Sequence, residues 1–414
     1  MNLFPSLPVL EELKKYINKG GDYRKFYIVS VQHLLETTGS LFEAIIDIGI
    51  QPDHIYLLGK PYSTHLPTRE LLQEKGIHVF TNRRQEHFGT SRETLKKDVA
   101  FMWEAITPSL KKGNVVIILD DGGLAIRHAP NSLFDTCTFY AIEQTTFGLR
   151  YQKNRDYFPI IQVATSAAKK FLEPNLIASA LIDKILSSLR KIKPKDIGVV
   201  GFGNIGKAVA RKLCKRYNVW IYDTNPLVTQ IEMGKLSSCK SLNELVERCD
   251  VIIGATGVDI SKPDWDELIT SDKTFISVSS GDIEFNTFIK RYNDQLTSNR
   301  FKTLDNIIIY LPSGITVTLL RGGTVANFNG SKESCPEKQI QLTRGLLLAG
   351  VLQAINNNLH ISDSNGSFKL KPLFQKVIVE KWLTDNPAFK TFYPKQLLEN
   401  FKDERWIEEN SGGN

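Results

Sequence analysis

The first part of the chain alternates short apolar runs with longer segments in which apolar residues recur at helical spacing. The helical segments lie at 41–48, 66–75 and 91–106, and the apolar runs lie at 26–31, 54–59, 77–80 and 114–120. A run as continuously apolar as 114–120 is typical of a strand buried on both faces of a parallel sheet. Alternating strands and helices indicate the α/β class. We therefore expect a mainly parallel sheet covered by helices.

A second alternation of the same kind follows a long helical segment at 176–191. Its predicted strands are 197–200, 219–222, 251–254 and 274–278, and its predicted helices are 205–217 and 242–249. Two further runs, 307–310 and 316–320, flank a Pro-Ser-Gly turn and predict a hairpin. An apolar helix is expected at 340–355. The pattern thus predicts two α/β units, the second built from βαβ repeats.

The turn after the strand at 197–200 carries the most specific local motif, Gly-Phe-Gly-Asn-Ile-Gly at 201–206. Gly201 permits a tight turn, Gly203 lets the backbone approach a pyrophosphate, and Gly206 lets the helix pack closely on the sheet. The first helical residues, Asn204 and Ile205, offer free N–H groups and the positive end of the helix dipole to phosphates. This strand–turn–helix context predicts dinucleotide binding.

The next predicted strand ends at Asp223, 22 positions after Gly201. A carboxylate there accepts hydrogen bonds from ribose hydroxyls and repels a 2′-phosphate. Thr224 and Asn225 provide no arginine for such a phosphate. The expected cofactor is therefore NAD rather than NADP.

Composition narrows the class of partner. The chain has 52 Lys and Arg against 45 Asp and Glu, and a net charge of +7 spread over 414 residues does not require a nucleic-acid partner. Five cysteines without a CxxC pair predict neither a disulfide framework nor a metal site, and fit a reducing cytosol. The first residues lack the pattern of a signal peptide, and no apolar run is long enough for a membrane span. We expect a cytoplasmic protein that binds a small molecule.

Several further motifs occur in a fixed order over roughly residues 25–355. They are Val31–Leu35, Tyr62–Thr64, Ile118–Gly123 with its Asp-Asp-Gly-Gly, Glu143–Gly148, Val163–Lys169 and Leu319–Asn327. Together they resemble the S-adenosyl-L-homocysteine hydrolase (adenosylhomocysteinase) family.

The resemblance implies an α/β fold in which a Rossmann-type NAD-binding domain is inserted in a larger α/β substrate domain. The expected boundaries are 1–178 for the first part of the substrate domain, 179–332 for the NAD domain, and 333–414 for the return and a C-terminal extension. It also implies a homo-oligomer with a place in one-carbon metabolism. In this family NAD reversibly oxidises a ribose hydroxyl, so a nucleoside-like substrate is expected.

The resemblance further implies roles for individual residues. His33 and Asp121 fall on the family's acid/base pair, and Gln144 replaces a glutamate. Lys169 falls on a ribose-side lysine if one residue is deleted before Phe171; otherwise Ala168 takes that position.

The cofactor positions are better retained. Thr145 and Thr146 match residues at the nicotinamide end, Thr256 follows the strand on the adenosine side, and Asn327 matches an asparagine at the carboxamide.

Two of the family's histidines have no counterpart, which argues against hydrolysis of S-adenosylhomocysteine itself. The leading hypothesis is an adenosylhomocysteinase-like NAD-dependent protein that acts on a nucleoside or ribosyl substrate. The alternative is a catalytically degenerate NAD-binding protein with a regulatory or partner-binding role. A 2-hydroxyacid dehydrogenase is placed third, because such enzymes require a histidine after the glycine motif and none occurs between Gly206 and Gly350.

Overall fold

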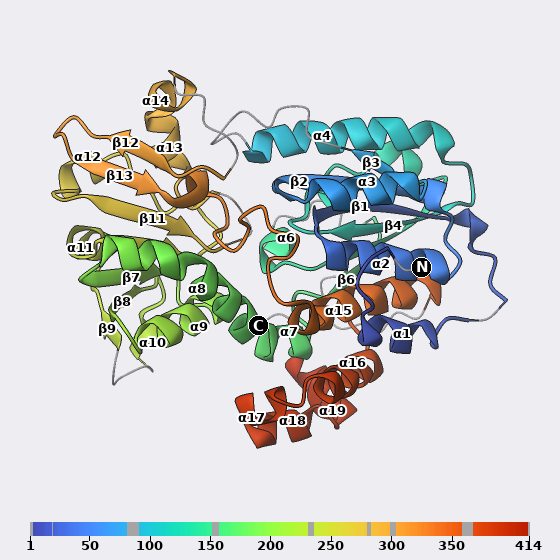
Figure 1. The fold of residues 1–414 in the computed structure, drawn as a ribbon. Coiled ribbons are helices and arrows are strands. Elements are labelled where there is room, and N and C mark those ends of the chain that lie inside the picture. The colour runs from blue at the N-terminus through green and yellow to red at the C-terminus, as the bar shows by residue number, and fades with distance from the viewer. Residues whose placement is uncertain are drawn as a thin grey trace. The chain divides into compact units, whose positions relative to one another are not determined.

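The computed structural model describes residues 3–18, 20–80, 91–150, 157–230, 236–279, 283–298, 304–357 and 367–412. These residues form two compact units (Figure 1). Unit 1 takes the described residues within Met1–Asn82, Leu95–Glu173 and Cys335–Asn414. Unit 2 takes those within Arg83–Thr94 and Pro174–Ser334.

Unit 1 is built on a seven-stranded sheet with the strand order β14-β6-β5-β4-β1-β2-β3. All of its neighbouring strands pair in parallel. The strands are β1 (Phe26–Leu34), β2 (Ile55–Thr64), β3 (His78–Phe80), β4 (Val115–Asp120), β5 (Thr138–Glu143), β6 (Ile160–Gln162) and β14 (Ser367–Lys369). Chain order reverses between β1 and β4, and ligands bind at such a switch point in open α/β sheets.

Helices cover both faces of this sheet. Figure 1 shows α4 (Ser91–Ile106) on one side and α2 (Glu36–Asp47) with α15 (Glu337–Ile355) on the other. Val99, Met102 and Trp103 of α4 pack in one core with alternate residues of β1 and β4, whose side chains are all buried. Helix α15, from the third and C-terminal segment of unit 1, contacts α2, β4 and β5.

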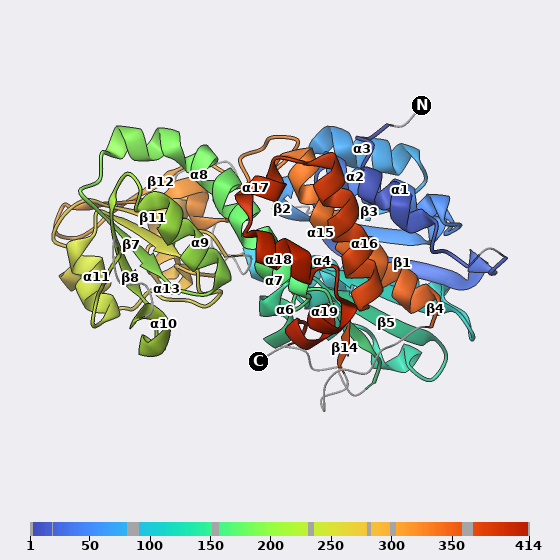
Figure 2. The same ribbon diagram turned by 90° about the horizontal axis from the view of Figure 1, so that it is seen from below.

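The remaining helices of unit 1 are shorter or lie outside this core. Figure 2 shows α15 and α16 side by side, and α1 contacts both of them. These helices are α1 (Pro8–Lys14), α3 (Leu66–Glu74), α5 (Leu124–Arg127), α6 (Thr146–Arg150), α7 (Ala167–Phe171), α16 (Pro372–Asp385), α17 (Phe389–Phe392), α18 (Lys395–Asn400) and α19 (Glu404–Asn410).

Unit 2 is also built on a seven-stranded sheet, in the order β12-β13-β11-β10-β7-β8-β9. Only β12 runs antiparallel to its neighbour, in the predicted hairpin with β13. The strands are β7 (Asp196–Val200), β8 (Asn218–Tyr222), β9 (Leu236–Ser238), β10 (Val251–Gly254), β11 (Lys273–Ser277), β12 (Ile307–Tyr310) and β13 (Thr316–Leu319). The switch point lies between β7 and β10.

Two apolar cores lie on opposite faces of this sheet. Residues such as Ile252 and Phe275 belong to one core, and their neighbours Ile253 and Ile276 belong to the other. The helices are α8 (Glu173–Ile192), α9 (Asn204–Leu213), α10 (Pro226–Gln230), α11 (Leu242–Arg248), α12 (Trp265–Leu268), α13 (Asn286–Arg291) and α14 (Asn293–Ser298). The predicted α/β class with a Rossmann-type unit is confirmed.

Some elements are not evident from the pattern. The strand predicted at 26–31 continues to Leu34. Strands β5, β6 and β14 are not predicted by the hydrophobic pattern. β6 and β14 have three residues each, too few to show a period.

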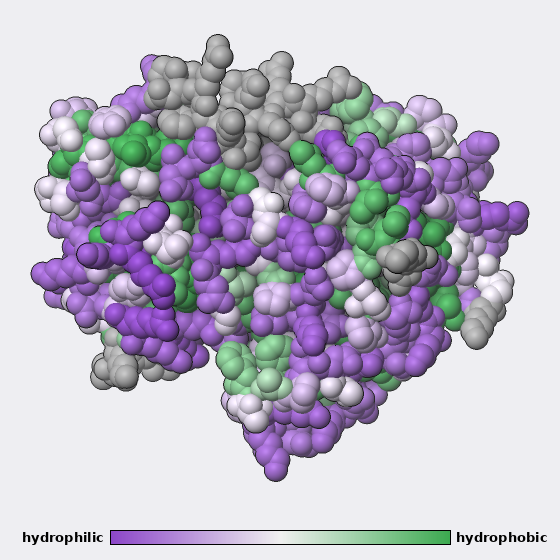
Figure 3. Space-filling model, in the orientation of Figure 1, coloured by the Kyte–Doolittle hydropathy of each residue, from purple (hydrophilic) through white to green (hydrophobic). Residues whose placement is uncertain are grey.

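On the face drawn in Figure 3 the described residues are mainly hydrophilic, with apolar side chains in small groups. No helix in the described ranges has both the length and the apolar composition that crossing a membrane requires.

Candidate functional site

Four polar side chains meet at the switch point of unit 1, where parallel strands end together. His33 lies near the end of β1, Lys60 lies in β2, Asp121 follows β4, and Gln144 follows β5. The backbone holds them in register, since Asp121 N donates to Val31 O (3.1 Å) and Gln144 N donates to Asp120 O (3.2 Å). The cluster thus follows from strand order.

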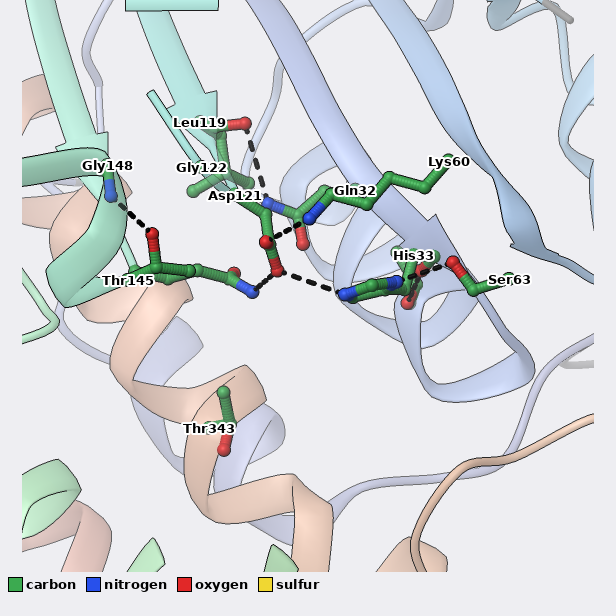
Figure 4. A network of polar contacts seen from close by, with 12 residues as sticks. Gln32, His33, Lys60, Ser63, Leu119, Asp121, Gly122, Thr145, Gly148 and Thr343 are labelled. Carbon is green, nitrogen blue, oxygen red and sulfur yellow. Dashed lines mark hydrogen bonds and ion pairs between the residues drawn. The ribbon is translucent and has the colours of Figure 1, made fainter. Parts of the chain in front are cut away.

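Asp121 is the centre of this cluster (Figure 4). Its carboxylate accepts hydrogen bonds from Lys60 Nζ and from Gln144 Nε2. His33 Nε2 lies 3.4 Å from Asp121 Oδ2, and all four side chains are buried. Three groups therefore orient one carboxylate, and the Oε1 atom of Gln144 stays buried with no hydrogen-bond partner among the described residues.

The two ring nitrogens of His33 have different partners. Because an ionised carboxylate can only accept, Nε2 carries the hydrogen that faces Asp121. Nδ1 then accepts from the Ser63 hydroxyl. Burial lowers the pKa of His33 to about 3, with Lys60 and Arg344 adding to this and Asp121 opposing it. The imidazole is thus neutral, in a fixed tautomer, in the middle of a Ser63–His33–Asp121 chain.

Asp121 stays ionised despite its burial. Burial raises its pKa, but the charge of Lys60 and the hydrogen bond from it, with further contributions from His33 and Lys169, outweigh this and bring the pKa down to about 2. The Lys60 side chain is 2% exposed and that of Asp121 is 3% exposed. Removing either charge would leave the other buried and uncompensated.

A second pair of carboxyl groups lies beside this cluster. Glu143 Oε1 accepts from Gly122 N (3.2 Å) and from the amide (2.7 Å) and hydroxyl (2.6 Å) of Thr145. Asp120 Oδ2 accepts from Ile126 N at 2.9 Å. Burial raises the pKa of Asp120 to about 7 and raises that of Glu143 well above its ordinary value. These carboxyls hold the turns that carry Asp121 and Gln144.

Lys169 pairs with a carboxylate outside the Asp121 cluster. Its Nζ pairs with Glu173 Oε1 at 2.6 Å, and the Thr343 hydroxyl donates to the same oxygen. It reaches Asp121 through its charge rather than by a direct hydrogen bond. Ala168, the alternative position, is buried and donates its N–H to Gln375.

Several residues of this site are not among the candidates predicted from the sequence. Lys60 sits inside an apolar strand, and that unusual position was the available signal. Ser63 occurs within a quoted motif but was given no role. Arg344 lies on α15, is 4% exposed and donates from Nε to Thr37 Oγ1 at 3.1 Å. The charge of Arg344 lowers the pKa of His33, and only the fold brings these two residues together.

The glycine turn of unit 2 has the geometry that its sequence predicts. Gly201 has a φ of +90°, which favours glycine. A Cβ on Gly206 would lie 1.9 Å from Gly201 O, so the helix can pack there only without a side chain. A Cβ on Gly203 would meet nothing within 4 Å. The turn therefore leaves open space at the N-terminus of α9, where Asn204 and Ile205 begin the helix.

Asp223 is held beside this turn. One carboxylate oxygen accepts from Phe202 N (2.7 Å) and the other from Asn225 N (2.8 Å). Each oxygen keeps a further lone pair, so ribose hydroxyls can still donate to it. The arrangement fits the adenosine ribose of NAD.

Two orphaned polar atoms lie at the carboxyl edge of the same sheet. Ser277 Oγ and Asn327 Oδ1 are buried, and no residue in the described ranges forms a hydrogen bond with them. Ser277 pairs with Gly254 in the sheet and bridges to Val325. Such atoms fit a polar ligand, and the cofactor role of Asn327 stays a prediction.

The predicted threonines are distributed over both units. Thr256 follows β10 in unit 2, and its N–H and hydroxyl both donate to Glu284. Thr145 belongs to unit 1, where its hydroxyl bonds to Glu143, and Thr146 is exposed at the start of α6. The cofactor roles of Thr145, Thr146 and Thr256 remain predictions.

Residues 178–261 match the family model of the D-isomer specific 2-hydroxyacid dehydrogenase, NAD binding domain. Two uncharacterized proteins from two strains of Mycobacterium tuberculosis are each 30% identical to the chain over 338 residues, which is 79% of this chain. The aligned region covers 64% of each of them, so the chain spans less than two thirds of their length.

Two solved structures are similar at low identity. The NAD-dependent formate dehydrogenase from Staphylococcus aureus in complex with NAD is 12% identical, with 80% of this chain and 95% of that chain covered and a TM-score of 0.38. The 2-hydroxyacid dehydrogenase from Ketogulonicigenium vulgare Y25 is 13% identical, with 81% and 94% covered and a TM-score of 0.36.

These findings correct the expected family. The resemblance to adenosylhomocysteinase is wrong, because the NAD-binding unit matches D-isomer specific 2-hydroxyacid dehydrogenases instead. The nucleoside-based function, the hydrolase chemistry and the link to one-carbon metabolism fall with it, and of the alternative hypothesis the NAD binding is supported. The prediction of NAD is confirmed: the matched domain is an NAD-binding domain, and its glycine turn and Asp223 have the geometry that NAD requires.

Proposed function

We propose that the protein is an NAD-dependent dehydrogenase that interconverts a small 2-hydroxy acid and the corresponding 2-oxo acid. The observation that carries this proposal is the match of residues 178–261 to the NAD-binding domain of D-isomer specific 2-hydroxyacid dehydrogenases. The polar cluster of unit 1 supports it, because it supplies the charges and the proton-transfer groups that such a reaction needs.

The electrostatic field in unit 1 favours a carboxylate substrate. Lys60 and Lys169 both lower the pKa of Asp121, and Lys60 and Arg344 both lower the pKa of His33. Three cationic side chains thus act on one buried cluster, in which Asp121 pairs with Lys60 and Glu173 pairs with Lys169. The buried Oε1 of Gln144 has no hydrogen-bond partner among the described residues and offers a further acceptor to the ligand. We assign this cluster to binding of the hydroxy acid.

Proton transfer is assigned to Ser63 and His33, because unit 2 provides no histidine after its glycine turn. In the oxidation direction, bound NAD would supply the hydride acceptor for the carbinol carbon. The Ser63 oxygen takes the hydroxyl proton of the substrate while its own proton passes to His33 Nδ1. The carbonyl forms, and Asp121 stabilises the resulting imidazolium. The imidazolium then releases this proton to solvent, and in the reduction direction His33 takes up a proton and passes it through Ser63 to the carbonyl oxygen.

Reduction of NAD by the purified protein tests this function. A panel of D- and L-2-hydroxy acids is offered with NAD, and the matching 2-oxo acids with NADH, and NADH absorbance is followed. We expect turnover with one enantiomeric series and none with adenosine or S-adenosylhomocysteine. Protein that binds NAD but turns over no hydroxy acid or oxo acid in the panel would contradict the proposal.

We keep a homo-oligomeric state and a cytosolic location as further proposals. None of the five cysteines, which all lie in the described ranges, forms a disulfide, and this suits a reducing compartment. Light scattering on the purified protein tests the first, and fractionation of cells that express the full-length protein tests the second.

A further inference from the structure

Glu284 is a fully buried carboxyl group in unit 2 that the reaction proposed above does not use. It lies between β11 and α13. Its Oε1 accepts from Thr256 N (2.8 Å), Gly257 N (2.7 Å) and Ser279 Oγ (2.5 Å). Its Oε2 accepts from Thr256 Oγ1 at 2.9 Å. One side chain therefore ties together the segments that follow β10 and β11.

The segment after β10 is in turn packed on the glycine turn. A Cβ on Gly201 would lie 2.8 Å from Thr256 Cγ2 and 2.9 Å from the backbone of Ala255. A Cβ on Gly206 would lie 3.3 Å from Ala255 Cβ. Residues 255–257 thus form one wall beside the turn, and Glu284 holds that wall from behind.

We propose that Glu284 is a positioning residue of the NAD site, which fixes residues 255–257 against the glycine turn and so sets the shape of the crevice for the dinucleotide. The inference depends on NAD binding by unit 2 and not on the dehydrogenase reaction. Glu284 acts through the loop, so it is not a catalytic residue.

A carboxylate is the group that this position requires. Two backbone N–H groups and two hydroxyls converge on it, and a carboxylate offers only acceptors. A glutamine would keep one acceptor oxygen and place an NH₂ group against one set of these donors. Hydrogen bonds to a charged group are stronger than neutral ones, so this exchange loosens the loop.

Asp259 provides a matched control in the same unit. Its carboxylate also accepts four hydrogen bonds, from the N–H and hydroxyl of Ser261 (3.1 and 2.6 Å) and of Thr287 (both 2.7 Å). None of these four bonds involves residues 255–257. Loss of Asp259 should lower stability without moving the wall beside the glycine turn.

The test compares Glu284→Gln with Asp259→Asn. NAD affinity is measured by titration calorimetry, and unfolding by urea. We expect Glu284→Gln to raise the Kd for NAD by about tenfold or more, as loss of a charged hydrogen bond implies. Asp259→Asn should leave that Kd within about twofold at a similar loss of stability. An unchanged Kd in Glu284→Gln, or equal changes in both variants, would overturn the proposal.

A milder variant covers the case in which Glu284→Gln does not fold. Ser279→Ala removes one donor to Glu284 and should raise the Kd for NAD by about threefold, with faster amide exchange at Gly257. Normal affinity and exchange in this variant would also overturn the proposal. Since no assay here uses a hydroxy acid, failure of the dehydrogenase proposal leaves these results interpretable.

Discussion

The two units share one strand order but place different chemistry at their switch points. In unit 1 the order around the switch is β3-β2-β1-β4-β5, and in unit 2 it is β9-β8-β7-β10-β11. In unit 2 the first strand ends at Val200 and a glycine turn follows. In unit 1 the first strand runs on to Leu34 and carries His33. One topology therefore presents backbone N–H groups in one unit and charged side chains in the other.

This difference determines what each switch point can bind. A turn without side chains lets phosphate groups approach the start of a helix, and NAD binding uses that approach. Polar and charged side chains instead occupy the switch point of unit 1, where Lys60 and His33 both contact Asp121. That arrangement suits a small substrate and proton transfer. The predictions below separate the two kinds of site, beginning with the largest expected effect.

Gly206→Ala should abolish NAD binding, with a Kd raised by about 100-fold or more. The new methyl group would lie 1.9 Å from Gly201 O, so α9 must shift away from the turn. Overpacking of this kind also lowers stability by about 1–3 kcal/mol. Titration with NAD and urea unfolding measure both effects. Hydrogen exchange in β4 of unit 1 should stay unchanged.

Gly203→Ala is the control for this prediction. Its methyl group would meet no protein atom within 4 Å, so the fold should be retained. NAD affinity should still fall, because the methyl group occupies space that the pyrophosphate needs. If Gly203→Ala bound NAD normally, the assignment of the phosphates to this turn would be wrong.

The glycine turn also explains why the cofactor could be predicted from sequence. Backbone sites require specific residue types at fixed spacing, so Gly201, Gly203 and Gly206 reveal the site directly. Lys60 and Glu284 have no such spacing. They join their partners only after strands far apart in sequence pair. The position of Lys60 in an apolar strand marks an unusual residue but does not indicate its partners, and Glu284 has no distinguishing pattern in the sequence.

Asp121→Asn should destabilise unit 1 by about 3–5 kcal/mol, because it leaves the buried ammonium of Lys60 without its counter-charge. NAD affinity should remain that of the wild type, since the glycine turn belongs to unit 2. Hydrogen exchange of β4 and β7 peptides reports the two units separately.

The double variant Lys60→Met, Asp121→Asn is the matched control. It removes both charges, so much of the lost stability should return. A double variant as unstable as Asp121→Asn alone would show that the pair is not the source of the effect.

The mistaken resemblance to adenosylhomocysteinase has a physical cause, which follows from the common topology of the two units. Polar residues and glycines gather where parallel strands end, so Asp120, Asp121, Gly122 and Gly123 follow β4 for reasons of topology. Motifs in such positions recur in the same order in any doubly wound sheet with this connectivity. Their collinearity predicted the α/β fold correctly and the family wrongly, because the order of such motifs does not distinguish one doubly wound family from another.

Ser63→Ala should lower kcat for the hydroxy acid by about 10- to 100-fold, with little change in KM, since it removes the hydroxyl that hydrogen-bonds to His33 Nδ1. Ser63→Thr retains a hydroxyl and should recover most of the activity. Nitrogen NMR of the His33 ring gives a second measurement that needs no substrate, because the Nδ1 shift reports loss of the hydrogen bond.

Ser109→Ala is the control for Ser63. Ser109 also lies in unit 1 and bonds to Tyr56 (3.3 Å), with no contact to His33. It should leave kcat and the Nδ1 shift unchanged. An unaltered Nδ1 shift in Ser63→Ala would remove Ser63 from the proton path.

The smallest expected effect concerns the carboxyl pair beside the cluster. Burial raises the pKa of Asp120 from its ordinary 3.8 to about 7, so the folded protein binds this proton more tightly than the unfolded chain does. Stability should therefore fall as pH rises between these two values, and the loss is complete above about pH 7.

Asp120→Asn mimics the protonated form and keeps an acceptor for Ile126 N, so it should match the wild type near pH 4 and exceed its stability near pH 8. The gain should be on the order of 1 kcal/mol, because Glu143 has a raised pKa too and can take up the proton instead. Urea unfolding across this range measures the slope; parallel curves for the two proteins would mean that Asp120 is ionised in the folded state, and that the switch point of unit 1 holds two neighbouring negative charges rather than one.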